Sequence, residues 1–165
     1  MGGKIHRYLA EDHERLDDAL RRATRDPGGI DREAYAEFRE GLLRHIGIEE
    51  KILLPAARAA QGGEPLDIAA RLHLDHGALA ALLVPNPTHA ILSIIRSILE
   101  RHNSLEEGDE GAYAECERLI GPDIDQVLLR VQNAPRVAVA PHVDSELAMD
   151  SARNALRRAG YDHVI

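Results

Sequence analysis

Residues 38–52 read FREGLLRHIGIEEKI, and this stretch decides the fold class of the chain. Phe38, Leu42, His45, Glu49 and Ile52 follow one another at intervals of four, three, four and three. This spacing places all five on one helix face, because residues three and four apart are neighbours on a helix surface. The segment therefore predicts an amphipathic helix whose buried stripe includes an imidazole and a carboxylate.

Three further segments have the same periodicity, and each carries a histidine where Leu or Ile would be usual. These stripes are Leu9, His13, Leu16 and Leu20; Leu72, His76, Leu79 and Leu83; and Ile91, Ile95, Ile98 and His102. Breaks rich in Gly and Pro at 26–29, 61–65 and 85–87 separate the helices, with Asp31 and Thr88 as N-caps. Because short loops favour antiparallel neighbours, the sequence predicts an all-α, up-down-up-down four-helix bundle.

The chain continues beyond these four helices. Gly108 interrupts the fourth, and the pattern predicts more helix at 109–120 and through about residue 131. Residues 135–142 are predicted to be an extended linker and 145–159 a short amphipathic helix. We therefore expect a domain at 1–134 and a C-terminal extension at 135–165, which packs on the bundle or forms a homo-oligomer.

Composition excludes several functional classes. The net charge is −8, which argues against nucleic acid as a partner, and no apolar run is long enough for a membrane span. The start, MGGKIH, lacks the apolar core of a signal peptide, and the single cysteine, Cys116, cannot form an internal disulfide. These features predict a soluble, cytoplasmic protein. Nine histidines against five aromatic residues need an explanation, since His is the commonest metal ligand.

His45 and His102 each have a glutamate one turn later, Glu49 and Glu106 respectively. Residues four apart lie one above the other on a helix, so each pair converges on a point beside it. A carboxylate on an apolar stripe needs a compensating cation, because burying an unpaired charge is expensive. A bound metal ion would supply that cation.

The pattern is duplicated along the chain. Leu-x3-His-x2-Leu-x3-Leu occurs at residues 9–20 and 72–83, and Leu-x2-His-x3-Glu-Glu at 42–50 and 99–107. Two helical hairpins with this arrangement would bring two matching halves to one centre. The candidate metal ligands are His13, His45, Glu49, His76, His102 and Glu106. Six nitrogen and oxygen donors suit two ions of the iron or manganese type better than structural zinc.

This ordered series resembles the hemerythrin-like, HHE-type cation-binding domain over about residues 5–130. The resemblance implies a four-helix bundle that holds two non-haem iron ions, in preference to manganese or zinc, with the four histidines as terminal ligands. Glu49 and Glu106 would bridge the ions together with an oxo or hydroxo group. The implied partner is a small diatomic or a peroxide, namely dioxygen, nitric oxide or hydrogen peroxide.

The chain departs from the oxygen-carrying members of that family. They place two histidines one turn apart on the third helix, whereas here the extra imidazole is His73, three residues before His76. His73 is a fifth ligand, a proton donor behind the ligands or a boundary residue, and these readings stay open. The fourth helix has His-x3-Glu in place of His-x4-Asp, which argues against reversible oxygen storage. If His73 does not bind a metal, an additional coordination position is open, and this favours a reaction with the bound molecule over simple storage.

Two functions follow from the resemblance. One is a binding or sensing protein for a small oxidant in oxygen, redox or iron homeostasis, which we favour over an enzyme. The alternative is a di-iron enzyme with catalase- or peroxidase-like activity or a role in nitrosative-stress repair. Asp12 and Asp75 are interpreted as solvent-facing charges in preference to partners of histidines on adjacent helices, and Cys116 as a core residue in preference to a redox thiol.

Overall fold

The computed structural model describes residues 2–163 and residue 165; Met1, where the predicted domain begins, and Val164 lie outside the described residues. The described chain is all-helical, as predicted, and has no strand. Its elements are α1 (Lys4–Ala23), α2 (Arg32–Ile48), the π-helical turn η1 (Glu49–Leu53), α3 (Leu54–Ala60), α4 (Ala69–Leu82), α5 (His89–Glu107), α6 (Ala112–Ile120), the 3-10 turn η2 (Gly121–Asp123), α7 (Ile124–Gln132) and α8 (Glu146–Arg158). None of the described helices is long and apolar enough to cross a membrane.

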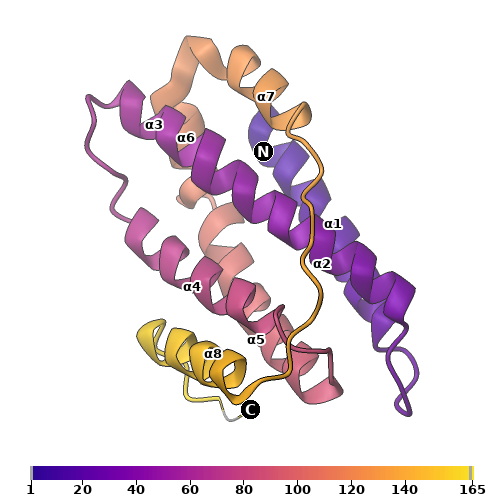
Figure 1. Ribbon diagram of the computed structural model, residues 1–165. Coiled ribbons are helices and arrows are strands. Elements are labelled where there is room, and N and C mark those ends of the chain that lie inside the picture. The colour runs from indigo at the N-terminus through magenta and orange to yellow at the C-terminus, as the bar shows by residue number, and fades with distance from the viewer. Residues whose placement is uncertain (1, 164) are drawn as a thin grey trace.

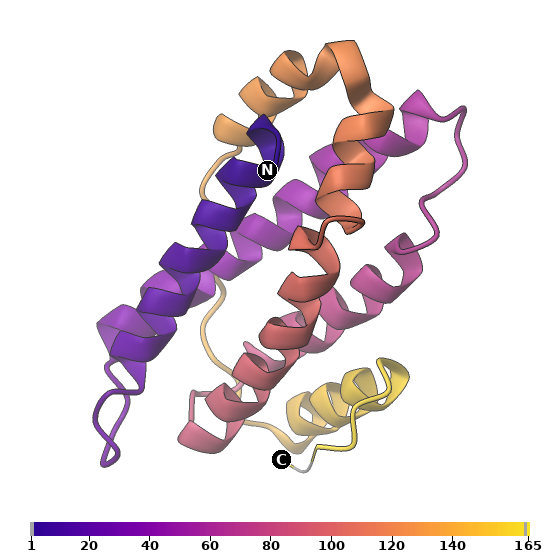
Figure 2. The same cartoon turned by 180° about the vertical axis from the view of Figure 1, so that it is seen from behind.

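The helices form two pairs that face each other. α1 lies along α2 and α4 lies along α5, while α6 continues beyond the end of α5 and contacts α1 and α3 (Figures 1 and 2). The two predicted N-caps are confirmed, because Asp31 accepts a hydrogen bond from Ala34 N and Thr88 accepts one from Ile91 N. These caps satisfy backbone donors that a helix start leaves free.

The apolar core consists of two clusters at different levels along the bundle. Leu16, Leu42, Leu79 and Ile98 belong to the first cluster, and Leu9, Ile48, Leu72 and Tyr113 belong to the second. On α1, His13 lies between Leu9 of the second cluster and Leu16 of the first, and the candidate histidines of α2 and α4 lie between the two clusters in the same way. The polar residues of the four stripes therefore form a layer between two apolar clusters.

One detail of the predicted stripes is wrong. The sequence pattern places Ile52 on the buried face with Glu49, but Ile52 is only half-buried, whereas Leu53 and Leu54 are buried. The cause is η1, which begins at Glu49 and adds about one residue to the turn, so the register shifts by one position. π-helical turns inside α-helices occur often at functional sites, and this one begins at a candidate ligand.

The C-terminal extension packs on the chain's own bundle. Residues 134–142 run along α2 (Figure 1), where Arg44 donates to Ala134 O, Arg39 donates to Ala140 O, and Arg136 pairs with Glu40. The helix α8 then lies against α4. The extended linker and the short amphipathic helix are thus both present, and a homo-oligomer formed through this segment stays a prediction.

Candidate metal centre

The structure brings together the six residues that the sequence singles out as candidate ligands. All six are buried in the layer between the two apolar clusters: His13, His45, Glu49, His76, His102 and Glu106. The first comes from α1, two come from the α2–η1 junction, one from α4 and two from α5. Their donor atoms form two groups that share Glu49 and Glu106, and in each group the donors lie within 4.8 Å of one another.

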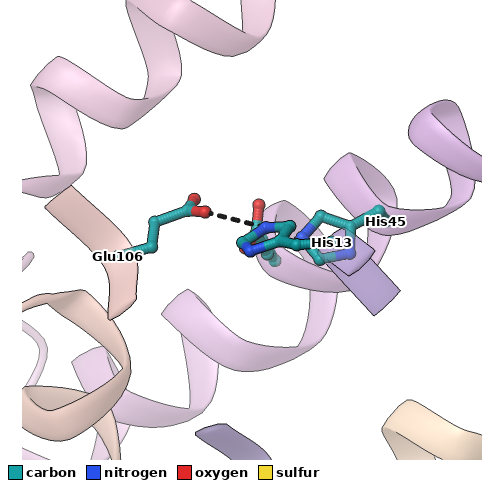
Figure 3. Close-up of side chains that lie close together, drawn as sticks. His13, His45 and Glu106 are labelled. Carbon is teal, nitrogen blue, oxygen red and sulfur yellow. Dashed lines mark ion pairs between the residues drawn. The ribbon is translucent and has the colours of Figure 1, made fainter. Parts of the chain in front are cut away.

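Site A is the group formed by His13, His45, Glu49 and Glu106. His13 Nε2 lies 3.2 Å from Glu106 Oε2, and His45 Nε2 lies 3.2 Å from Glu49 Oε1. Figure 3 shows the two imidazoles side by side, with Glu106 reaching towards them from the opposite side; their ring centroids are 4.5 Å apart. Site A thus joins the α1–α2 pair to the end of α5.

Site B is the group formed by Glu49, His76, His102 and Glu106. His76 Nε2 lies 3.0 Å from Glu49 Oε2, and His102 Nε2 lies 2.8 Å from Glu106 Oε1. The two Nε2 atoms are themselves 3.1 Å apart, although they belong to different helices. Four donors from three segments therefore point at one small volume.

Each of the two shared carboxylates presents one oxygen to each site. Glu49 turns Oε1 towards His45 in site A and Oε2 towards His76 in site B. Glu106 turns Oε2 towards His13 in site A and Oε1 towards His102 in site B. This is the arrangement that two carboxylates need to span two cations.

Every candidate histidine has a carboxylate on its outer nitrogen. The pairs, with their nitrogen–oxygen distances, are His13 with Glu107 (2.5 Å), His45 with Asp12 (2.7 Å), His76 with Glu50 (2.7 Å) and His102 with Asp75 (3.1 Å). Because an ionised carboxylate can only accept, each Nδ1 is the donor. Each Nε2 is left as the nitrogen that can bind a metal, and carboxylates placed in this way orient metal-binding histidines.

The solvent-facing interpretation of Asp12 and Asp75 is therefore wrong. Both are buried, and each serves a histidine of the neighbouring helix in its pair, the role that the sequence analysis ranks second. A helical residue cannot orient the ring next to it in sequence, because the two side chains point about 100° apart. The antiparallel pairing of helices supplies the partner that the helix itself cannot.

The carboxylates raise the pKa values of the four imidazoles. Burial alone would lower the pKa of His45, but the charge of Glu49 and the hydrogen bond to Asp12 raise it to about 10. Burial is outweighed in the same way at His76, where the nearby carboxylates of Glu106, Glu49 and Glu50 raise the pKa to about 11. The pKa of His102 rises to about 9, and that of His13 also rises. At neutral pH and without metal, protonated imidazoles therefore balance the negative charge of the buried carboxylates.

Tyr113 of α6 is a member of the site that the sequence analysis misses. Its hydroxyl donates to Glu49 Oε1 at 2.5 Å and lies 3.1 Å from Glu106 Oε2 and 3.2 Å from both His13 Nε2 and His45 Nε2. Burial and the two carboxylates raise the pKa of Tyr113 well above its usual value, so the phenol keeps its proton. The hydroxyl thus contacts all four members of site A.

Two carboxylate oxygens of site B lack a hydrogen-bond partner among the described residues. Glu49 Oε2 and Glu106 Oε1 are buried and have no hydrogen bond from any described residue. The imidazole nitrogens are close to them, but the rings do not direct an N–H at the oxygens, so a hydrogen bond does not form. Buried carboxylate oxygens without a partner cost free energy, and a cation in site B would satisfy both.

Two other predicted candidates lie outside the sites. The side chain of His73 is 76% exposed and lies 3.2 Å from Glu50. It is therefore at the surface, where it contacts the same carboxylate as His76. Cys116 is buried in the second apolar cluster, and burial raises its pKa to about 12. Its setting is that of a core residue, as favoured from the sequence.

The comparisons with known proteins agree with this geometry. Residues 4–114 match the family model of the hemerythrin HHE cation-binding domain, which is about two thirds of the chain. The comparison with curated proteins and the comparison with solved structures return no match. The matched range contains all six candidate ligands and ends just after Tyr113. This chain belongs to the hemerythrin HHE cation-binding domain family.

Proposed function

We propose that the protein holds two non-haem iron ions, one in site A and one in site B, and that a small oxidant binds or reacts there. The observation that carries the proposal is the pair of shared carboxylates, each of which turns one oxygen to each site. His13 and His45 would be the terminal ligands in site A, and His76 and His102 those in site B. The four helices that carry these ligands would then form an up-down-up-down bundle.

Charge balance supports two divalent ions. The four imidazoles, each with a raised pKa, carry about four positive charges when protonated. Two divalent cations carry the same charge, so ions can replace these protons without leaving the buried carboxylates uncompensated. Iron would supply exchange of electrons with a bound oxidant.

The chain's own residues prepare the site for this ligand. The carboxylates on Nδ1 fix the ring orientations, the two apolar clusters exclude bulk water, and Tyr113 holds a proton on its oxygen next to Glu49. A cavity of about 320 Å³ reaches the imidazole of His13 from between α1 and α5, and Leu16, Leu99 and Asn103 help to line it. It offers a small oxidant a route to site A.

One observation favours the catalytic alternative, peroxide or nitrosative chemistry, over storage. His73 is directed to solvent, so each site has four donors, apart from the neutral phenol of Tyr113. Iron sites with few protein ligands keep positions open for a substrate. We propose that such a position receives dioxygen, nitric oxide or peroxide in redox or iron homeostasis.

The test is an optical spectrum of the iron-loaded protein before and after dioxygen, nitric oxide and hydrogen peroxide are added separately. We expect at least one of them to change the visible spectrum. A band that disappears when oxygen is removed indicates binding, and gas evolved from peroxide indicates catalysis. The matched variant Glu49→Gln, which removes one shared carboxylate, should lose the response. A spectrum that none of the three reagents alters would overturn the proposal.

A further inference from the structure

Asp75 is the most completely bound carboxylate around the centre. It is fully buried, and its Oδ2 accepts the hydrogen bond from His102 Nδ1. Its Oδ1 accepts a hydrogen bond at 2.9 Å from the hydroxyl of Tyr161 and another from the guanidinium of Arg71. A carboxylate held by three donors has no freedom to rotate, and neither has the imidazole that it orients.

Tyr161 belongs to the C-terminal extension, outside the range that matches the family model. Helix α8 ends before Gly160, whose φ of +81° turns the chain, and Tyr161 N then donates to Leu156 O. Glycine is favoured in this left-handed conformation because a side chain would be strained there. The turn aims Tyr161 back at α4 and Asp75.

The extension is anchored to the same face by packing and by Arg71. Ala152, Leu156 and Tyr161 are buried in the first apolar cluster. The Arg71 guanidinium donates to Ala159 O at 2.7 Å and lies 5.8 Å from the centre of the Tyr161 ring. Arg71 thus ties the extension and Asp75 together, and the position of Tyr161 follows from that of α8.

The corresponding carboxylate of site A has no such connection. Asp12 orients His45, but its only other hydrogen bond among the described residues comes from Arg15, on its own helix. The Arg15 side chain is 68% exposed, whereas that of Arg71 is 31% exposed. Sites A and B therefore have similar candidate ligands, but Asp12 and Asp75, which orient a histidine in each site, have different hydrogen-bond partners.

We propose that Tyr161 is a positioning residue for site B, through which the C-terminal extension holds Asp75 and thereby aims the Nε2 atom of His102. The inference rests on the proposed dinuclear centre and deepens it. Loss of a partner behind a metal ligand typically weakens metal binding about 10- to 100-fold. Tyr161 acts one hydrogen bond further out, and Arg71 remains on Asp75. We therefore expect Tyr161→Phe to weaken binding at site B about tenfold and to leave site A unchanged.

The experiment is a titration of the metal-free full-length protein with Co²⁺, followed by visible absorption and native mass spectrometry. Asp12→Asn and Asp75→Asn show which of the two stepwise constants belongs to site A and which to site B. Tyr161→Phe keeps the ring in the core and removes only the hydroxyl. Tyr35→Phe is the control, because the Tyr35 hydroxyl is buried without a hydrogen bond among the described residues.

The result that supports the inference is a selective loss at site B in Tyr161→Phe, with Tyr35→Phe unchanged. The loss should shrink to less than about twofold when Tyr161→Phe is combined with Asp75→Asn, because residues that act through one another are not additive. Unchanged constants in Tyr161→Phe, or an equal loss at both sites, would overturn it. Wild-type protein that binds fewer than two Co²⁺ ions would overturn the proposed function itself, so the two failures can be told apart.

Discussion

Replacing His102 by Ala should remove one metal ion and leave the other. His102 belongs only to site B, where its Nε2 lies 2.8 Å from Glu106 Oε1, and site A keeps all four of its members. We expect the metal content to fall from two ions to one per chain. A variant that keeps two ions would refute the assignment of His102 as a ligand.

The same change should destabilise the metal-free protein by a predictable amount. Removing one partner of a buried ion pair costs about 3–5 kcal/mol, and Asp75 keeps Tyr161 and Arg71, so we expect about 3 kcal/mol. Each kcal/mol corresponds to roughly 2–4 °C for a chain of this size, which gives a decrease in Tm of about 6–12 °C by calorimetry. His89→Ala is the control, because His89 donates to Gly29 O away from the centre. An unchanged Tm would contradict the reasoning.

Three further predictions follow from the same contacts. Tyr113→Phe should lower the stability of the metal-free protein by about 1.5–3 kcal/mol, the value of a hydrogen bond to a charged group, in thermal melts; loss of a bound ion would show instead that the phenol oxygen is a ligand. Asp12→Asn should weaken metal binding at site A alone, about 10- to 100-fold, in a Co²⁺ titration, and equal weakening at both sites would contradict this. The pKa values of His102, His45 and His76 are raised to about 9, 10 and 11 in the metal-free fold. Their protonation stabilises the fold fully below 6.5, the pKa of histidine in the unfolded chain, and this stabilisation is lost as the pH rises through 9–11. The Tm of the metal-free protein should therefore fall over that pH range, and a Tm that rises there would contradict the prediction.

Much of the fold could be predicted because helical periodicity is a local signal. The stripes, the caps at Asp31 and Thr88 and the helix after Ser145 all depend on residues within a few positions of one another. The π-helical turn at Glu49 could not be predicted in this way, because it changes the helical period that the prediction of the buried face assumes. The expected burial of Ile52 is wrong for that reason.

The residues that form hydrogen bonds with the candidate ligands were harder to predict from the sequence. Glu50 and Glu107 are the second glutamates of the two repeats, and Asp12 and Asp75 also recur, so the duplication itself was a signal that could have assigned them a role. Tyr113 carries no comparable signal. It reaches site A because the chain turns at Gly111, where a Cβ would lie 2.6 Å from the Glu106 carbonyl oxygen. Such a turn depends on close packing between segments, which periodicity does not describe.

The most direct test of the central claim is the metal content of the purified full-length protein, determined together with its optical spectrum. Glu49 and Glu106 each face both sites, so the account predicts two iron ions per chain and a visible spectrum that responds to an added oxidant. Glu106→Gln, which removes the second shared carboxylate, should bind fewer ions. A protein that binds one ion per chain, or none after incubation with ferrous iron, would contradict the account.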